Sequence, residues 1–333
     1  MKHTQNNLTF LRWVAACLVF YGHAFVFMGR PAPTFLGYLP LGALGVYIFF
    51  SISGYLIAQS WDNDPNPYRY ITRRALRIFP ALIANTVLTV FIIGPLFTSL
   101  SLSKYFSNSQ TWGYFSNIFL YNTYSLPGVF EHNTYPNAIN GSLWSLIIEF
   151  SMYILLMLIG IIRLPRIWNI IIVISMLILI KFLILTTHEM LVIYRTDVRQ
   201  LVICGIYFWV GATIYRYNIN RFFTISYAYC AIICVLISTY QYDIFIIVFS
   251  ILLPFIIIAF GLSTQKILTL FTNYDYSYGI YIYAFPIQQS IAYISPKINF
   301  ALYLIITFIL TLLCGHASYK YIEKPALALK PVK

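Results

Sequence analysis

Residues 8–28 read LTFLRWVAACLVFYGHAFVFM, an apolar segment long enough to cross a lipid bilayer as a single helix. The segment contains Arg12 and His23, although ionisable side chains are costly inside a bilayer and are mostly functional there. Their separation of eleven residues is close to three helical turns, so both side chains lie on one face, about 16 Å apart along the axis. This spacing suits a site that receives one ligand from each side of a membrane.

The composition predicts an all-α, polytopic integral membrane protein. Hydrophobic residues make up 60% of the chain and charged residues only 9%, whereas a soluble domain is about a quarter charged. About ten segments are suited to transmembrane helices, and they lie at residues 8–28, 41–60, 77–98, 142–162, 167–186, 199–215, 222–239, 244–260, 276–294 and 299–319. We expect one membrane-embedded domain over residues 1–333, with no appended soluble domain and with the first segment retained rather than cleaved.

The basic residues predict the orientation. If the N-terminus is cytoplasmic, fifteen of the 21 Lys and Arg side chains fall on the cytoplasmic side and six on the other. The positive-inside rule therefore places both termini in the cytoplasm. The net charge of +12 follows from this bias, so we expect no nucleic-acid partner. The five cysteines all lie in apolar segments, and no histidine or carboxylate accompanies Cys230 and Cys234, so we expect no metal site.

The longest predicted loop, residues 99–141, then lies outside the cytoplasm. It is rich in Tyr, Asn and Ser, and Trp112 belongs to a short apolar stretch suited to the membrane surface. Loops of this length are usually functional or disordered. Its aromatic and amide side chains suit a carbohydrate ligand, and they suit a plain interfacial loop as well.

His23 is the candidate base within the membrane, because imidazole titrates near neutrality and can take a hydroxyl proton. The alternative is a neutral imidazole hydrogen-bonded between helices. Glu149, in GSLWSLIIEFSMYILL, is expected at a similar depth. Antiparallel helices would permit a carboxylate–imidazole pair that orients the ring. The alternative for Glu149 is a buried carboxylate neutralised by Arg or Tyr.

A basic cluster occurs at the cytoplasmic start of the third segment, YRYITRRALRIFPAL. Arg69, Arg73 and Arg77 recur every four residues and so share a helix face, and Arg74 lies beside them. Converging guanidinium groups bind polyphosphates in bidentate fashion, and Arg12 lies at the same membrane side. The cluster predicts a phosphate-bearing ligand from the cytoplasm. The simpler interpretation, a positive-inside anchor, is favoured for Arg69.

Small residues interrupt the second segment. The sequence SISGYLIAQS at residues 51–60 contains Ser51, Ser53 and Gly54. Small side chains permit close approach between the backbones of transmembrane helices. We therefore expect a tight helix contact at this position.

Six pieces of the sequence resemble, in order, the membrane acyltransferase 3 family, which includes bacterial O-acetyltransferases of surface polysaccharides. They are FLRWVAACLVFYGH, GVYIFFSISGYLI, RRALRIFPAL, SLWSLIIEFSMY, SYGIYIYAFP and YIEKPA. The resemblance implies ten core transmembrane helices and a multi-pass protein of the bacterial cell (inner) membrane. It also implies acetyl-CoA as acyl-donor co-substrate without a permanently bound cofactor. The implied partners are acyl-CoA, a glycan or lipid-linked sugar acceptor, membrane lipid and polysaccharide-assembly proteins.

The resemblance also implies roles for individual residues. His23 and Arg12 match the family's essential pair, with His23 as base or acyl carrier, and Glu149 matches the acidic residue of its Trp-Ser-x-x-x-Glu stretch. Two positions depart from the pattern, because many members carry an acidic residue at Tyr47 and a histidine at Ala284. The basic motif expected to hold the donor comprises Arg73, Arg74 and Arg77, and the expected substrate contacts are Trp144, Ser145 and Tyr281.

Two other function classes are compatible with many membrane spans. A transporter or flippase of a polyprenyl-linked glycan would explain the spans and the long loop, but such proteins often contain internal repeats, and we find none in the sequence. A structural scaffold would not need a membrane-embedded Arg–His pair. Binding of acyl-CoA distinguishes the acyltransferase from both.

Overall fold

The computed structural model describes residues 7–186, 191–222, 225–263 and 275–331. The chain ends and three internal stretches therefore lie outside the described residues. The long helices are α1 (Leu8–Phe27), α2 (Leu41–Asn63), α3 (Pro67–Leu88), α7 (Trp144–Ile161), α8 (Ile167–Thr186), α9 (Val198–Arg216), α10 (Ile225–Ser238), α11 (Tyr242–Leu262), α12 (Ser277–Ile294) and α13 (Phe300–Ser318). The short helices are α4 (Gly94–Phe97), α5 (Leu102–Ser107), α6 (Ser109–Gly113) and α14 (Lys324–Ala328).

Single turns and two small hairpins complete the described fold. The π-helical turns are Thr89–Ile93 and Tyr319–Glu323, and the 3-10 turns are Tyr114–Phe119, Gly141–Leu143 and Ile219–Phe222. Strands β1 (Thr34–Phe35) and β2 (Leu39–Pro40) pair antiparallel, as do β3 (Val192–Ile193) and β4 (Thr196–Asp197). These two-residue strands close loops between helices and add no sheet layer.

Each of the ten predicted segments overlaps a long helix. Within the described residues, seven helical stretches are long and apolar enough to cross a membrane: Leu8–Phe27, Leu41–Asn63, Pro67–Phe97, Gly141–Ile161, Val198–Arg216, Tyr242–Leu262 and Phe300–Ala328. Two shorter apolar helices cover Ile167–Phe182 and Ser226–Ser238. The helical class is therefore confirmed, while the count of ten spans and the orientation stay predictions.

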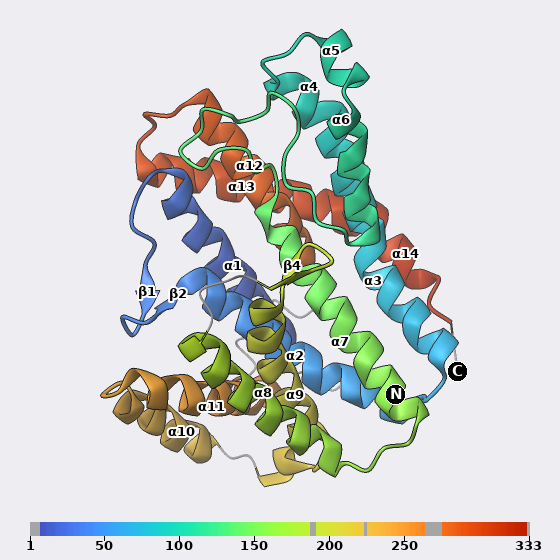
Figure 1. Ribbon diagram of the computed structural model, residues 1–333, viewed down its shortest axis with the longest axis vertical. Helices are drawn as coiled ribbons and strands as arrows, with labels where there is room; N and C mark the ends of the chain where they lie inside the picture. Colours follow the sequence, from blue (N-terminus) through green and yellow to red (C-terminus); the bar gives the residue numbers. More distant parts are fainter. Residues whose placement is uncertain (1–6, 187–190, 223–224, 264–274, 332–333) are drawn as a thin grey trace.

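Helix α2 crosses the middle of the bundle between α1 and α9 (Figure 1). Its contact with α9 is close because Gly54 lies directly against the carbonyl of Phe208, where a Cβ atom would clash with the backbone. Gly211 of α9 lies in the same way against the carbonyl of Ser51. The tight contact expected from the small residues of α2 is thus confirmed.

Helices α1 and α12 lie side by side and run in the same direction. Near their starts, the rings of Trp13 and Tyr276 make an edge contact with centroids 5.5 Å apart. Further along both helices, Gln288 Nε2 donates a hydrogen bond to the carbonyl of Phe20 at 3.0 Å. This register places the starts of both helices at one end of the bundle, where Arg12 and Asp275 lie within reach of Arg77 of α3.

Helix α3 starts ten residues before the predicted span. Pro67 occupies its first turn, and the side chain of Asn66 caps it by accepting a hydrogen bond from the Arg69 amide at 3.0 Å. These start signals outweigh the drop in hydropathy at the arginines. The basic cluster is therefore carried on a rigid helix, and α14 lies alongside it (Figure 1).

The long loop after α4 is folded rather than extended. Tyr105, Tyr114 and Phe130 are fully buried in a small core of their own. Trp112 remains half-exposed, and its indole nitrogen donates to the carbonyl of Phe106 at 2.8 Å. The carbohydrate contact suggested for this loop stays a prediction.

Candidate active site

A cavity of about 310 Å³ lies between α1, α2, α3, α7 and α12, and we name it the central cavity. Seven of the nine predicted site residues line it: Arg12, Arg73, Arg74, Arg77, Ser145, Glu149 and Tyr281. His23 and Trp144 do not line it, and Trp144 packs instead against the apolar core. The first-helix arginine, the α3 arginines and the α7 carboxylate are thus brought together from three separate parts of the sequence.

Asp275, immediately before α12, holds two of the arginines. Its Oδ2 accepts hydrogen bonds from Arg12 Nη1 at 3.2 Å and from Arg77 Nη2 at 2.7 Å. Burial raises the pKa of Asp275, but Arg77, Arg12 and the hydrogen bonds from Ser277 outweigh this effect and lower that pKa to about 2. Sequence reasoning missed Asp275, because its contact with the arginines depends on the packing of α12 beside α3.

A second carboxylate, Asp64, holds two more arginines in the turn between α2 and α3. It accepts hydrogen bonds from Arg69 Nε at 2.9 Å and from Arg73 Nη2 at 2.5 Å. Hydrogen bonds from Arg69 and then from Arg73 hold the pKa of Asp64 well below its usual range. Arg69 does not line the cavity, and its guanidinium instead holds the turn between α2 and α3 through Asp64.

Two cations of the central cavity have no carboxylate partner in the described part of the chain. Arg74 makes a 3.4 Å contact with Ser60 Oγ, and its buried Nε has no hydrogen-bond partner. Lys330, which follows α14, also lines the cavity. Burial, together with Arg74, Arg77 and neighbouring guanidinium groups, lowers the pKa of Lys330 to about 8. Nothing in the sequence singled out Lys330 from other terminal lysines.

Deeper in the cavity, Glu149 is surrounded by hydroxyl groups. It accepts hydrogen bonds from Ser53 Oγ at 3.1 Å and from Tyr153 Oη. One turn earlier on α7, Ser145 Oγ is 2.6 Å from Tyr281 Oη, which donates to the Ser142 carbonyl at 2.8 Å. We name the part of the cavity lined by Ser145 and Tyr281 the hydroxyl end.

His23 lies next to this hydroxyl end but in apolar surroundings. Its ring contacts Phe285 and Phe27, with centroids 5.2 and 5.9 Å away. Its Nδ1 is buried, and no described residue gives it a hydrogen bond. Because Phe285 follows Tyr281 by one turn on the same face of α12, His23 is positioned just beyond the hydroxyl groups of the cavity.

The expected His23–Glu149 pair is not formed in this structure. The His23 ring packs against Phe285 of α12, and Glu149 is instead hydrogen-bonded to Ser53 and Tyr153. The hydrogen bond from Tyr153 to Glu149 fits the alternative stated above, in which Arg or Tyr neutralises a buried Glu149 carboxylate.

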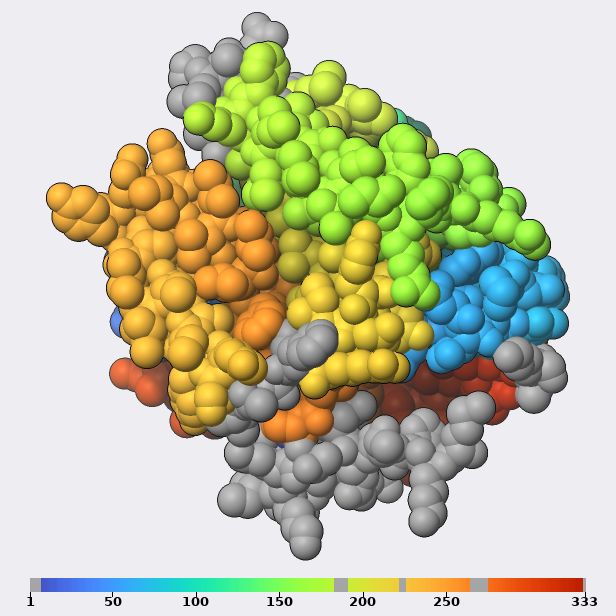
Figure 2. All heavy atoms as spheres, turned by 90° about the horizontal axis from the view of Figure 1, so that it is seen from below, coloured from blue at the N-terminus to red at the C-terminus, as the bar shows by residue number. Residues whose placement is uncertain are grey.

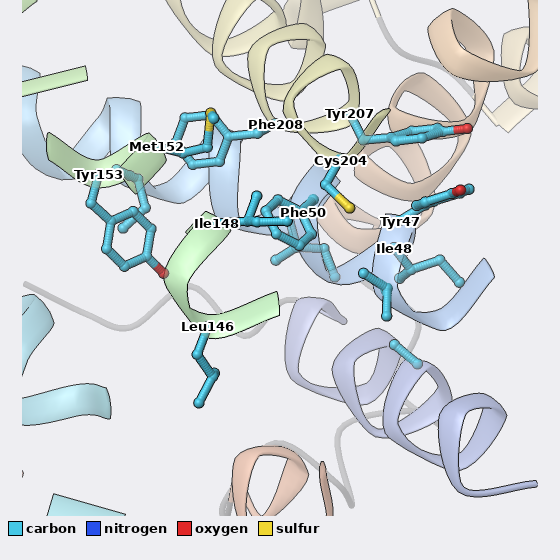
Figure 3. Packing of buried hydrophobic residues seen from close by; sticks show 14 of the residues in the cluster. Tyr47, Ile48, Phe50, Leu146, Ile148, Met152, Tyr153, Cys204, Tyr207 and Phe208 are labelled. Carbon is cyan, nitrogen blue, oxygen red and sulfur yellow. The ribbon is translucent and has the colours of Figure 1, made fainter. Parts of the chain in front are cut away.

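The two positions that depart from the family pattern are packing sites. The Tyr47 ring stacks on Tyr207 with centroids 4.2 Å apart, as Figure 3 shows beside Cys204. Ala284 is buried and faces away from solvent. Neither residue lines the central cavity.

Comparisons with known proteins identify relatives of the chain. Residues 5–319 match the family model of acyltransferase 3, described as an acyltransferase domain. The chain is 29% identical to an O-acetyl transferase of Shigella phage Sf6, over 97% of this chain and 96% of the relative. It is 31% identical to nodulation protein 10 of Rhizobium leguminosarum bv. viciae, over 46% of this chain and 43% of the relative. No solved structure matches. The chain belongs to the acyltransferase 3 family.

Proposed function

We propose that this acyltransferase moves an acetyl group from cytoplasmic acetyl-CoA to a sugar hydroxyl of a surface polysaccharide or lipid-linked glycan, in the bacterial cell membrane. One observation carries the proposal: a single cavity joins the guanidinium groups of α1 and α3 to the hydroxyl groups next to His23. The similarity to an O-acetyl transferase supports the acetyl group and the oxygen acceptor.

The basic end of the cavity is suited to the phosphates of CoA. Arg74 and Lys330 have no carboxylate partner among the described residues. Arg12 and Arg77 share the carboxylate of Asp275, and Glu323 lies 3.9 Å from Arg77. Cations that repel one another across a cavity gain free energy when a polyanion enters. Guanidinium groups bind phosphate oxygens in bidentate fashion. We assign this end to the cytoplasm, where acyl-CoA is available.

The hydroxyl end is suited to the transfer step. The pantetheine arm would extend along α1 from Arg12 toward His23, about 16 Å along the helix axis. The acceptor hydroxyl oxygen then bonds to the thioester carbonyl carbon while His23 takes its proton. The carbon–sulfur bond breaks, and the departing CoA sulfur receives that proton. In this scheme Tyr281 and Ser145 contact the reacting carbonyl oxygen.

Glu149 keeps a role that does not require contact with His23. It lines the cavity between the arginines and the Ser145–Tyr281 pair. We assign it to fixing the hydroxyls of Ser53 and Tyr153 along the path of the donor arm. Its substitution by Gln should therefore weaken transfer less than loss of His23.

The test uses purified protein with radiolabelled acetyl-CoA and membrane glycolipid. We expect the wild-type protein to label glycolipid and the His23→Ala variant to bind CoA without transferring label. Normal transfer by His23→Ala would reject the role of His23. If no acyl-CoA binds to the wild-type protein, the transporter interpretation takes precedence, because a flippase needs no acyl donor.

A further inference from the structure

A second cavity, of about 410 Å³, opens at the same end of the bundle as the arginines of α3. We name it the α2–α9 cavity, because the end of α2, the turn after α7 and the end of α9 enclose it. In Figure 2 these segments meet on the face seen from below, in light blue, green and yellow. Its polar lining consists of Asp62, Arg163, Arg166 and Arg216.

Arg216 is the unusual member of this group. Its side chain is only 6% exposed, yet its Nε has no hydrogen-bond partner among the described residues. Its Nη1 donates to Asn169 Oδ1 at 3.3 Å, and its Nη2 is 3.8 Å from Asp62 Oδ1. A buried guanidinium with an unsatisfied donor is costly. This side chain therefore has unused capacity to bind an anion.

The charges around Arg216 favour the same ligand. Arg163 and Arg166 are exposed at the rim of the cavity, while Asp62 is its single carboxylate. Three guanidinium groups against one carboxylate leave an excess of two positive charges. A phosphate group matches both this charge and the planar donor geometry of arginine.

The surroundings of the cavity indicate how the phosphate is presented. Ile162 is 66% exposed, Ile167 49% and Trp168 41%, and these side chains flank Arg163 and Arg166. Exposed apolar and indole side chains beside arginines are typical of the level at which lipid headgroups meet acyl chains. A soluble phosphate would make no use of these apolar neighbours.

We propose that the α2–α9 cavity binds the phosphate group of an anionic phospholipid. The cavity shares no lining residue with the central cavity. Trp61 lines only the α2–α9 cavity, and its ring makes an edge contact with Tyr70 of α3 at 5.3 Å. The proposal depends on insertion into a membrane but not on the acyl-transfer reaction.

The experiment measures lipid retention by the purified full chain with native mass spectrometry, after exchange into phosphatidylglycerol or phosphatidylcholine. We expect wild-type protein to retain phosphatidylglycerol selectively. The double variant Arg163→Gln/Arg166→Gln should lose about tenfold in this affinity. Its matched control is Arg221→Gln/Lys324→Gln, which removes two exposed cations from outside the cavity and should retain wild-type affinity.

Asp62→Asn separates binding from a merely structural role. Removing the single carboxylate frees Arg216, so phosphatidylglycerol affinity should rise several-fold, whereas a purely structural residue would lower stability without improving binding. Equal retention by wild type and the Arg163/Arg166 variant would overturn the proposal. So would full competition by millimolar glycerol 1-phosphate, because that result would identify a site for soluble phosphate.

Discussion

The two ends of helix α1 carry ionisable groups in opposite situations. At one end, Arg12 shares a carboxylate with Arg77 and faces a cavity lined by further cations. At the other, His23 packs against phenylalanine rings, with Nδ1 lacking any hydrogen-bond partner in the described residues. The basic end is preformed around internal counter-ions, whereas the histidine end has an unused polar atom. The difference suggests that the donor binds to a prepared site and that the acceptor completes the environment of His23.

The largest expected effect comes from breaking the histidine end alone. In His23→Gln, an amide replaces the imidazole and cannot take a proton, so kcat should fall about 100-fold to 10,000-fold. The dissociation constant for CoA, measured by calorimetry, should stay within about twofold of wild type, because the basic end is untouched. A parallel loss of CoA binding would show that the two ends are not separable.

The next effect concerns the basic end alone. Arg74 has no carboxylate partner in the described chain, and a charge-assisted hydrogen bond contributes about 1.5–3 kcal/mol. Arg74→Gln should therefore weaken CoA binding about 10-fold to 100-fold and change kcat little at saturating donor. Arg69→Gln is the matched control, because Arg69 lies on the same helix but outside the cavity. Equal effects of the two substitutions would reduce the cluster to a membrane anchor.

Much of the basic end could be predicted from sequence because its residues are local. Arg73, Arg74 and Arg77 lie on one helix, and the spacing of a helix fixes their common direction. The apolar segments were equally accessible, since length and hydropathy determine them. The predicted span began at residue 77 because hydropathy marks a membrane boundary, whereas Pro67 and the Asn66 cap mark the start of helix α3.

The remaining parts of the site depend on contacts between distant segments. Asp275 and Lys330 reach the central cavity only after α12 and α14 pack beside α3, and no local pattern encodes that packing. For the same reason the partner of Glu149 could not be chosen from sequence. Similar depth in two helices did not reveal that His23 packs against Phe285 while Glu149 bonds to Ser53 and Tyr153.

A smaller effect tests whether the internal counter-ion competes with the donor. Asp275→Asn removes the carboxylate that holds Arg12 and Arg77, so CoA affinity should rise several-fold while thermal stability falls. The pKa of Asp275 is lowered from 3.8 to about 2 in the folded protein. Its contribution to the unfolding free energy, about 2 kcal/mol, is therefore present above pH 4 and lost as the pH falls from 4 toward 2.

Thermal unfolding from pH 6 to pH 2.5 measures this contribution. The wild-type and Asp275→Asn melting temperatures should converge toward acid pH, since a protonated carboxyl is also neutral. Weaker CoA binding by Asp275→Asn would contradict competition and would make Asp275 a residue that positions the two arginines.

The smallest expected effect concerns Lys330. Its pKa of about 8 in the empty site means that its positive charge is present at pH 7 and lost as the pH rises toward 9. The guanidinium groups facing it from α1 and α3 stay charged over this range, and so do the CoA phosphates. CoA affinity of the wild-type protein should therefore fall about threefold to tenfold between pH 7 and pH 9. Lys330→Arg should abolish this decline, because arginine keeps its charge.

Lys330→Met should bind CoA at pH 7 as weakly as wild type does at pH 9, with no further decline. Lys324→Met serves as the control, because Lys324 is exposed in the same segment and does not line the cavity. A pH profile that is unchanged in Lys330→Arg would assign the titration to another group. In that case the arginines alone, without Lys330, would account for CoA binding at the basic end.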